Sequence, residues 1–251
     1  MLPARAHATV VALALLLAAA TPAPAAEILV HAAASLTDVL EEIGGAWQGS
    51  SGHAVLFNLG GTSDLGRQLR AGAPGDVFLS ADREQMDLVE RAGLVRAADR
   101  IDLLTNVLVV VVPIGAPAPP RGPRDLLAVK RLTLADPEAV PAGVYARRWL
   151  ASAGLWDALR GRVVPSLNVR AALAAVESEN AGAAVVYRTD AATSRRVRVA
   201  FEVPREQAPP IVYVAAPLAG SRHPEVARAF LRHLASPPAR AVFQRHGFVP
   251  L

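Results

Sequence analysis

Short apolar runs alternate with segments of helical periodicity along most of the chain. The first run, 28–30, is followed by apolar residues at helical spacing, which are Leu36, Val39, Leu40, Ile43 and Trp47. This alternation continues through the sequence and indicates an α/β architecture with largely parallel sheets. Further strands are expected at 54–58, 76–80, 106–113, 132–135, 162–165, 183–187, 197–203 and 211–215.

Helices are expected between most of these strands and at the C-terminus. Pro141 suits the first turn of one helix, Asn168 is a candidate N-cap of the next, and Gly247 is a candidate helix stop. The helical segments fall near 36–47, 65–70, 83–94, 124–127, 141–150, 168–176, 225–234 and 239–245.

The order of the elements predicts two α/β lobes. Two β-rich segments, 106–112 and 211–215, lie where the chain can cross between them. We therefore expect residues 27–105 and 211–251 to form one lobe and residues 106–210 to form the other. No internal repeat accompanies this division.

The N-terminal residues 1–26 have the layout of a secretory signal peptide. Arg5 precedes an apolar run at 10–20, and small residues at 23–26 offer a cleavage site after Ala25 or Ala26. The run is too short for a permanent membrane anchor, and no later segment is expected to span a bilayer. The mature chain is expected to be exported and soluble.

Composition narrows the chemistry. The chain contains no cysteine, which removes thiolate catalysis and cysteine-based metal sites. The formal net charge is +4, and the densest basic cluster, Arg195-Arg196-Val197-Arg198, has no interleaved aromatic residues. It is interpreted as a solvated helix end or strand edge, so no nucleic-acid partner is expected.

Small and hydroxyl residues stand at several strand–helix junctions. Ligands of open α/β folds bind at the carboxyl ends of parallel strands, where helix N-termini present free N–H groups. Ser35 is a candidate N-cap with Asp38 as a weak capping-box partner, and on its own it fits a structural role as well as an anion site. The other junctions carry Thr62, Ala142-Gly143, Asn168-Val169 and Tyr187. Together these neutral donors suit a fully ionised oxyanion.

The enzymatic alternatives have less support. Ser35 lies four residues after His31, which allows a secreted serine hydrolase as the alternative function, but no Gly-x-Ser-x-Gly motif is present. The remaining mature histidines match no metal-ligand spacing, and no metal site is expected. Asp136 and Glu138 form a close carboxylate pair, which we interpret as part of a proline turn.

Seven segments resemble one family in sequence and in order. The chain is similar to the periplasmic molybdate-binding proteins of ABC transporters over essentially its whole mature length. The segments are Ala32–Thr37, Gly61–Leu65, Gly72–Asp82, Asp136–Ala146, Val169–Leu173, Val186–Ala191 and Phe243–Phe248.

This resemblance implies a two-lobed periplasmic-binding-protein fold of type II, with two crossing strands and the ligand in the cleft. It implies that the oxyanion is held without a counter-ion by Ser35 and Thr62, through side chain and backbone, the N–H groups of Ala142 and Val169, and the Tyr187 hydroxyl. Thr62 departs from the family, which usually has serine there.

The function implied is extracytoplasmic, high-affinity binding of molybdate, and tungstate as well, with delivery to an inner-membrane ABC permease. The expected protein is a periplasmic monomer without enzymatic activity or cofactor. A transcription regulator with the same architecture would need an N-terminal DNA-binding segment, where this chain has a signal-peptide pattern.

Overall fold

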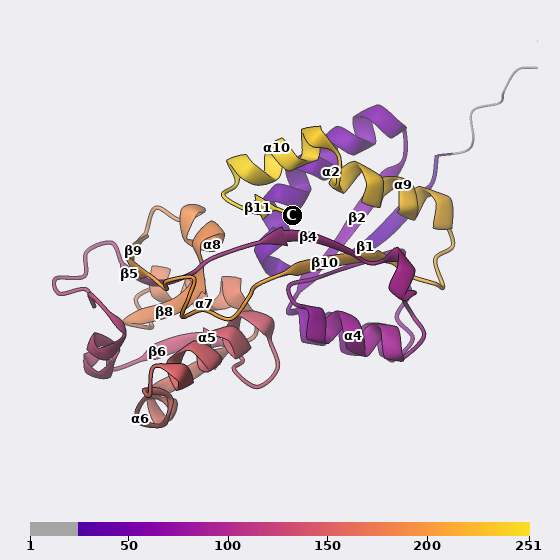
Figure 1. The fold of residues 1–251 in the computed structure, drawn as a ribbon. Coiled ribbons are helices and arrows are strands. Elements are labelled where there is room, and N and C mark those ends of the chain that lie inside the picture. The colour runs from indigo at the N-terminus through magenta and orange to yellow at the C-terminus, as the bar shows by residue number, and fades with distance from the viewer. Residues whose placement is uncertain (1–24) are drawn as a thin grey trace, which may run out of the picture.

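The computed structural model describes residues 25–251, which form two α/β lobes joined by two crossing segments (Figure 1). The predicted signal peptide lies almost entirely in residues 1–24, outside the described residues. Within residues 25–251, no helix combines the length and the apolar character that a membrane-spanning segment requires.

The first lobe is built on a six-stranded sheet of order β11-β4-β10-β3-β1-β2. Its strands are β1 (Glu27–Ala33), β2 (Ala54–Gly60), β3 (Val77–Ser80), β4 (Ile101–Thr105), β10 (Tyr213–Pro217) and β11 (Val249–Pro250). Its helices are α2 (Thr37–Ser51), α3 (Thr62–Arg70), α4 (Arg83–Arg91), α9 (Pro224–Leu234) and α10 (Pro237–Arg245), with a 3₁₀ turn η1 at Ala34–Leu36 and another, η2, at Ala97–Asp99.

The second lobe is built on a five-stranded sheet of order β7-β6-β8-β5-β9. Its strands are β5 (Leu108–Pro113), β6 (Leu132–Ala135), β7 (Val163–Ser166), β8 (Ala183–Tyr187) and β9 (Val197–Glu202). Its helices are α5 (Pro141–Ser152), α6 (Trp156–Leu159), α7 (Val169–Glu177) and α8 (Arg188–Ala192), with 3₁₀ turns η3 (Pro123–Ala128) and η4 (Arg160–Arg162).

The α/β fold agrees with the prediction, but both sheets are mixed and not mainly parallel. In the first sheet β1 pairs in parallel with β2 and β3, whereas β10 is antiparallel to both β3 and β4. In the second, β6 is parallel to β7 and β8, whereas β5 is antiparallel to β8 and β9. The strands that run against the parallel ones are β5 and β10, which adjoin the crossings, and β11 at the C-terminus, which is antiparallel to β4.

Two segments carry the chain between the sheets. The strand expected at 106–113 begins two residues later, as β5, and a separate strand, β4, precedes it. Between β4 and β5 the chain crosses from lobe 1 to lobe 2 at Asn106 and Val107. It returns through residues 203–212 to β10 (Figure 1). We propose residues 27–105 with 211–251 as lobe 1 and residues 106–210 as lobe 2.

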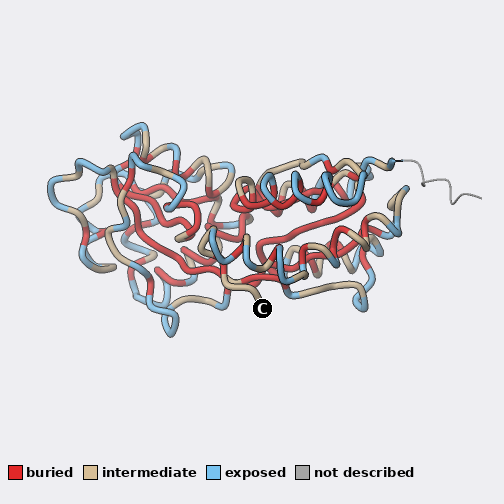
Figure 2. Tube along the Cα trace, turned by 90° about the horizontal axis from the view of Figure 1, so that it is seen from above, coloured by how far each residue is buried: buried red, intermediate tan, exposed pale blue. Residues whose placement is uncertain are grey.

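The apolar periodicity of the sequence corresponds to buried packing. Leu36, Val39, Leu40, Ile43 and Trp47 are all buried. On the other side of the first sheet, α3 and α4 enclose a separate core with β3 and β10, which contains Leu65, Leu69, Phe78, Met86, Val89 and Val214. Figure 2 shows the buried chain running through the interior of both halves of an elongated molecule. These cores hold the strand ends, and therefore the junction residues, in place.

Candidate functional site

A small cavity between the two lobes collects all five residues named by the sequence. Ser35 and Thr62 contribute from lobe 1, and Ala142, Val169 and Tyr187 contribute from lobe 2. The remaining lining residues are Ala33, Ala34, Gly60, Gly61, Ala81, Val140, Pro141 and Asn168. None of these lining residues carries a charge, so the cavity is walled by small side chains, hydroxyls and backbone.

Ser35 does not have the capping role expected of it. It lies in the 3₁₀ turn η1, helix α2 begins at Thr37, and the residue before it, Leu36, makes no side-chain cap. Thr37 Oγ1 donates to the Ala34 carbonyl at 2.7 Å, and Asp38 turns away to Arg170. The tight turn holds the Ser35 side chain at the cavity, where its hydroxyl is free of the helix.

Thr62 is the first residue of helix α3, and it is 1% exposed. Its Oγ1 accepts a hydrogen bond from the Ala81 backbone N–H at 3.2 Å. Because that bond occupies an oxygen lone pair, the hydroxyl hydrogen remains available to the cavity.

Ala142 and Val169 lie in the first turns of helices α5 and α7. Backbone N–H groups in a first turn have no carbonyl partner within their own helix. Asn168 caps α7 as predicted, accepting from the Ala171 N–H at 2.9 Å, which leaves the Val169 N–H to the cavity. The helix macrodipoles place partial positive charge at the same two points. These helix ends can hold an anion without a cationic side chain.

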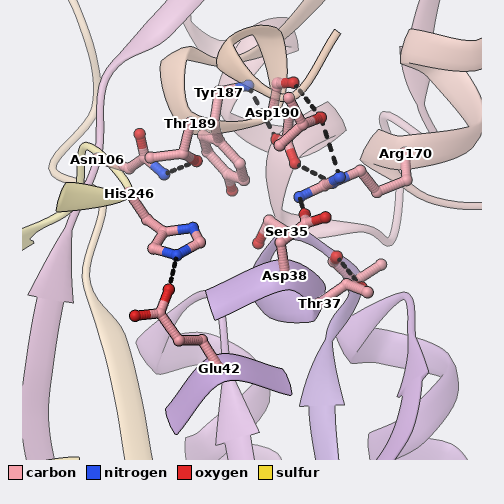
Figure 3. Close-up of polar contacts among 12 residues, drawn as sticks. Ser35, Thr37, Asp38, Glu42, Asn106, Arg170, Tyr187, Thr189, Asp190 and His246 are labelled. Carbon is pink, nitrogen blue, oxygen red and sulfur yellow. Dashed lines mark hydrogen bonds and ion pairs between the residues drawn. The ribbon is translucent and has the colours of Figure 1, made fainter. Parts of the chain in front are cut away.

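Tyr187 is the last residue of strand β8 and is 1% exposed. Its hydroxyl has no hydrogen-bond partner in the part of the chain that the structure describes. Burial raises the pKa of Tyr187 well above its ordinary value, so the phenol stays protonated and can donate. In Figure 3 its hydroxyl end points toward the segment that carries Ser35.

An ion-pair network that sequence reasoning missed joins Arg170 to Asp38 and Asp190 (Figure 3). Arg170, next to Val169, contacts Asp190 at 2.6 Å in its own lobe and Asp38 at 2.5 Å in lobe 1. Asp190 is completely buried and its other carboxylate oxygen accepts from the Tyr187 N–H. The network therefore ties together the segments that carry Ser35, Val169 and Tyr187. Arg170 and Asp190 lie in the segments Val169–Leu173 and Val186–Ala191 that resemble the family, but no local pattern in the sequence indicates that they form a pair.

A second ion pair joins the lobes at another place on the cleft. Arg148 of helix α5 contacts Glu84 of helix α4 at 2.6 Å, and both side chains are exposed. Surface pairs of this kind contribute little to stability.

The residues considered for catalysis have structural partners. His31 is buried; its Nε2 lies 2.8 Å from the Pro74 carbonyl and its Nδ1 lies 3.0 Å from the Asn58 amide nitrogen. Asp136 Oδ1 accepts from the Glu138 N–H in the expected turn. Across residues 25–251, no three His, Cys, Asp or Glu side chains gather closely enough to hold a metal ion. The hydrolase alternative has no support in this arrangement.

Two buried aspartates, Asp82 and Asp190, have raised pKa values. Burial raises the pKa of Asp82 to about 6 despite a hydrogen bond from the Gln85 N–H, and burial raises the pKa of Asp190 to about 6 against the opposing effect of Arg170. Both values exceed the 3.8 of an unperturbed aspartate. A raised carboxyl pKa adds stability that is fully present below 3.8 and is lost as the pH rises through about 6.

We expect Asp82→Asn to remove this contribution while keeping the cap of helix α4, because an asparagine oxygen can accept from Gln85 N–H. Urea unfolding gives the free energy of unfolding of each protein. The wild-type value minus the variant value is expected to increase by about 2–3 kcal/mol as the pH falls from 7 to 4. A difference that stays constant over this range, or that shrinks toward pH 4, would contradict the prediction.

Comparison with known proteins adds three findings. Residues 28–249 match the family model described as bacterial extracellular solute-binding protein. The chain is 37% identical over 228 residues to the molybdate-binding protein ModA of Escherichia coli (strain K12), covering 88% of each chain. The substrate-binding domain of a putative molybdenum ABC transporter from Clostridium difficile is 28% identical with a TM-score of 0.69, covering 90% of this chain and 100% of that chain.

The fold has a further close counterpart. The periplasmic molybdate-binding protein of Azotobacter vinelandii superimposes with a TM-score of 0.78 over 88% of this chain and 98% of that chain. Its sequence identity of 24% makes this a likeness of fold.

Proposed function

The chain belongs to the bacterial extracellular solute-binding protein family, and on that premise we propose that it binds molybdate between its lobes and delivers it to an ABC permease. The family resemblance inferred from the sequence is confirmed by the match over residues 28–249. The main support for this proposal is a cavity lined by uncharged residues, one of which is Tyr187. The buried Tyr187 hydroxyl has no hydrogen-bond partner among residues 25–251.

The donors of the cavity support a fully ionised oxyanion. The Thr62 oxygen already accepts from Ala81, the Tyr187 phenol stays protonated, and the helix N-termini at Ala142 and Val169 offer only N–H groups. An anion that itself carries a proton, such as hydrogen phosphate, is best bound where a carboxylate accepts that proton, and the residues that line the cavity include no carboxylate. Molybdate, tungstate and sulfate carry no proton at neutral pH and need no such acceptor.

We propose that the cavity distinguishes molybdate and tungstate from the smaller sulfate by size. The walls are helix ends and strand ends held by packed cores, so they do not contract around a smaller tetrahedron. We propose that molybdate and tungstate bind and that sulfate binds much more weakly, with Ser35, Thr62, Ala142, Val169 and Tyr187 as the ligands. The relative in E. coli named as molybdate-binding supports the choice of molybdate.

The cellular setting belongs to the same proposal. We propose a periplasmic monomer, exported by its N-terminal segment, that needs no cofactor and hands its anion to an inner-membrane permease. The crossing segments at 106–107 and 203–212 would serve as the hinge on which the lobes open and close.

Calorimetric titration of the purified protein with molybdate, tungstate, sulfate and phosphate tests the proposal. Molybdate and tungstate are expected to bind at one site and to raise the melting temperature, because a ligand that binds only the folded state stabilises it. Sulfate and phosphate at equal concentration are expected to leave the melting temperature almost unchanged. Binding of sulfate as tight as that of molybdate would refute the size argument, and absence of molybdate binding would refute the function.

Tyr187→Phe is expected to lower molybdate affinity without lowering the stability of the ligand-free protein. Molybdate affinity is expected to fall about tenfold to a hundredfold, the effect of one hydrogen bond to a charged ligand. Without ligand, the free energy of unfolding is expected to stay the same or rise slightly, because the removed hydroxyl has no partner among the described residues. Ser35→Ala is expected to lower affinity by about 1–3 kcal/mol in the same assay. Wild-type affinity in both variants would mean that the ligand lies elsewhere.

A further inference from the structure

We propose that Tyr213, oriented by Asn106, positions the Ser35 hydroxyl as a hydrogen-bond donor to the bound anion. The proposal rests on the proposed function, since it concerns how that anion is held. Neither Tyr213 nor Asn106 lines the cavity, and both act through Ser35.

The hydrogen bonds of the Asn106 side chain fix its orientation. Its Oδ1 accepts from the Val107 N–H at 2.9 Å, which assigns the amide oxygen to that side. The Nδ2 group therefore faces Thr189 Oγ1 at 2.9 Å and Tyr213 Oη at 3.4 Å. An amide NH₂ can only donate, so the Tyr213 oxygen accepts from Asn106.

The Tyr213 hydroxyl hydrogen is then directed to its other neighbour. Ser35 Oγ lies 2.9 Å from Tyr213 Oη, and the tyrosine is 1% exposed. Burial keeps the pKa of Tyr213 above its ordinary value, so the phenol retains its hydrogen at every physiological pH. Tyr213 donates to Ser35, and Ser35 accepts.

Ser35 consequently has its own hydrogen free for the cavity. A serine hydroxyl carries one hydrogen and two lone pairs, and the bond from Tyr213 uses a lone pair. Thr62 on the opposite junction has the same arrangement, with the Ala81 N–H in place of the tyrosine. Both lobe 1 hydroxyls are thereby fixed as donors before the anion arrives, which reduces the ordering required on binding.

The positioning residues lie at the two crossings between the lobes, Asn106 within the first and Tyr213 directly after the second. Asn106 lies between β4 and β5, Tyr213 begins β10, and Thr189 belongs to helix α8 of lobe 2. The hydrogen-bond chain from Thr189 through Asn106 and Tyr213 to Ser35 therefore passes through the hinge. Figure 3 shows the hydrogen bond from Asn106 to Thr189, beside Tyr187.

A double-mutant cycle tests this role. Tyr213→Phe keeps the ring and removes only the hydroxyl, and is expected to lower molybdate affinity about tenfold, as for one lost hydrogen bond. In a Ser35→Ala background the same change is expected to cost less than about twofold, because its target is gone. The preference for molybdate over phosphate is also expected to shrink in Tyr213→Phe, since the Ser35 hydroxyl is then no longer fixed as a donor and can turn to accept from a protonated oxyanion.

Thr133→Val is the matched control. It removes a buried hydroxyl whose oxygen lies 2.9 Å from Ser166 Oγ, within lobe 2 and away from the cavity, and it is expected to leave affinity unchanged. An equal loss from Tyr213→Phe in both backgrounds, or wild-type affinity in Tyr213→Phe alone, would overturn the positioning role. The melting temperature without ligand reports any folding defect separately. A wild-type protein that fails to bind molybdate would instead overturn the proposed function.

Discussion

Gly143→Ala is expected to weaken anion binding about tenfold to a hundredfold and to destabilise the fold. A Cβ at this position would lie 2.0 Å from the Ala135 carbonyl oxygen and 2.5 Å from the Asp136 carbonyl oxygen. Both are backbone atoms at the end of strand β6, so they cannot move aside as a side chain can. Helix α5 must therefore shift away from the sheet, and the N–H of Ala142 in its first turn must shift with it.

The expected cost is about 3 kcal/mol in the free energy of unfolding, at the upper end of the range for overpacking. Loss of one charge-assisted hydrogen bond lowers affinity about tenfold to a hundredfold in addition. Urea unfolding and calorimetric titration measure the two effects. Gly45→Ala in helix α2 is the matched control, because the added Cβ would meet nothing within 4 Å. Alanine is also more stable than glycine at an exposed position inside a helix. A Gly143→Ala protein with wild-type stability and affinity would show that the contact of α5 with β6 is not required.

Arg170→Met is expected to destabilise the protein by about 3 kcal/mol at pH 8, because it leaves the buried Asp190 carboxylate without its cation. The loss of Arg170 raises the pKa of Asp190 further above about 6, since the guanidinium is the main group that lowers it. Stability tied to a raised carboxyl pKa is lost as the pH rises, so the deficit relative to wild type shrinks as the pH is lowered toward 5. Urea unfolding at pH 5, 6, 7 and 8 measures this trend.

Asp38→Asn separates the two roles of Arg170. It weakens the partly exposed contact between the lobes and leaves the Arg170–Asp190 pair in place. The expected loss of stability is at most about 1 kcal/mol and nearly independent of pH above 5. If Arg170→Met showed the same small, pH-independent loss, Asp190 would not depend on Arg170 for its charge.

Much of the site was accessible from the sequence because its residues stand at element boundaries. Hydrophobic periodicity locates where strands end and helices begin, and Thr62, Ala142 and Val169 lie at those points. Asn168 was predicted as a cap because an asparagine before a periodic run has a local partner, the N–H three residues on. Such local chemistry needs no knowledge of the fold. The resemblance to a known family indicated which of the strand–helix junctions form the binding site.

The parts that depend on distant partners were not accessible in this way. Ser35 was expected to cap its helix, but Tyr213, which is 178 residues away in sequence, determines its hydrogen bond. The antiparallel strands beside each crossing follow from the path of the chain between lobes, which a periodic pattern does not encode. The Arg170 network joins residues that are separated by 20 and 132 positions. A single sequence offers no signal for such pairings.

The position of β10 in the first sheet has a consequence for how the chain folds. This strand, close to the C-terminus, lies between β3 and β4, so β4 does not pair with any strand of the β1–β2–β3 unit and joins their sheet only when β10 inserts. Lobe 2, with all its strands between residues 108 and 202, can complete its sheet earlier from a continuous segment. Lobe 1 must wait for contacts of high sequence separation, which form slowly. We therefore expect refolding in two kinetic phases, with the strands of lobe 2 protected from hydrogen exchange before those of lobe 1.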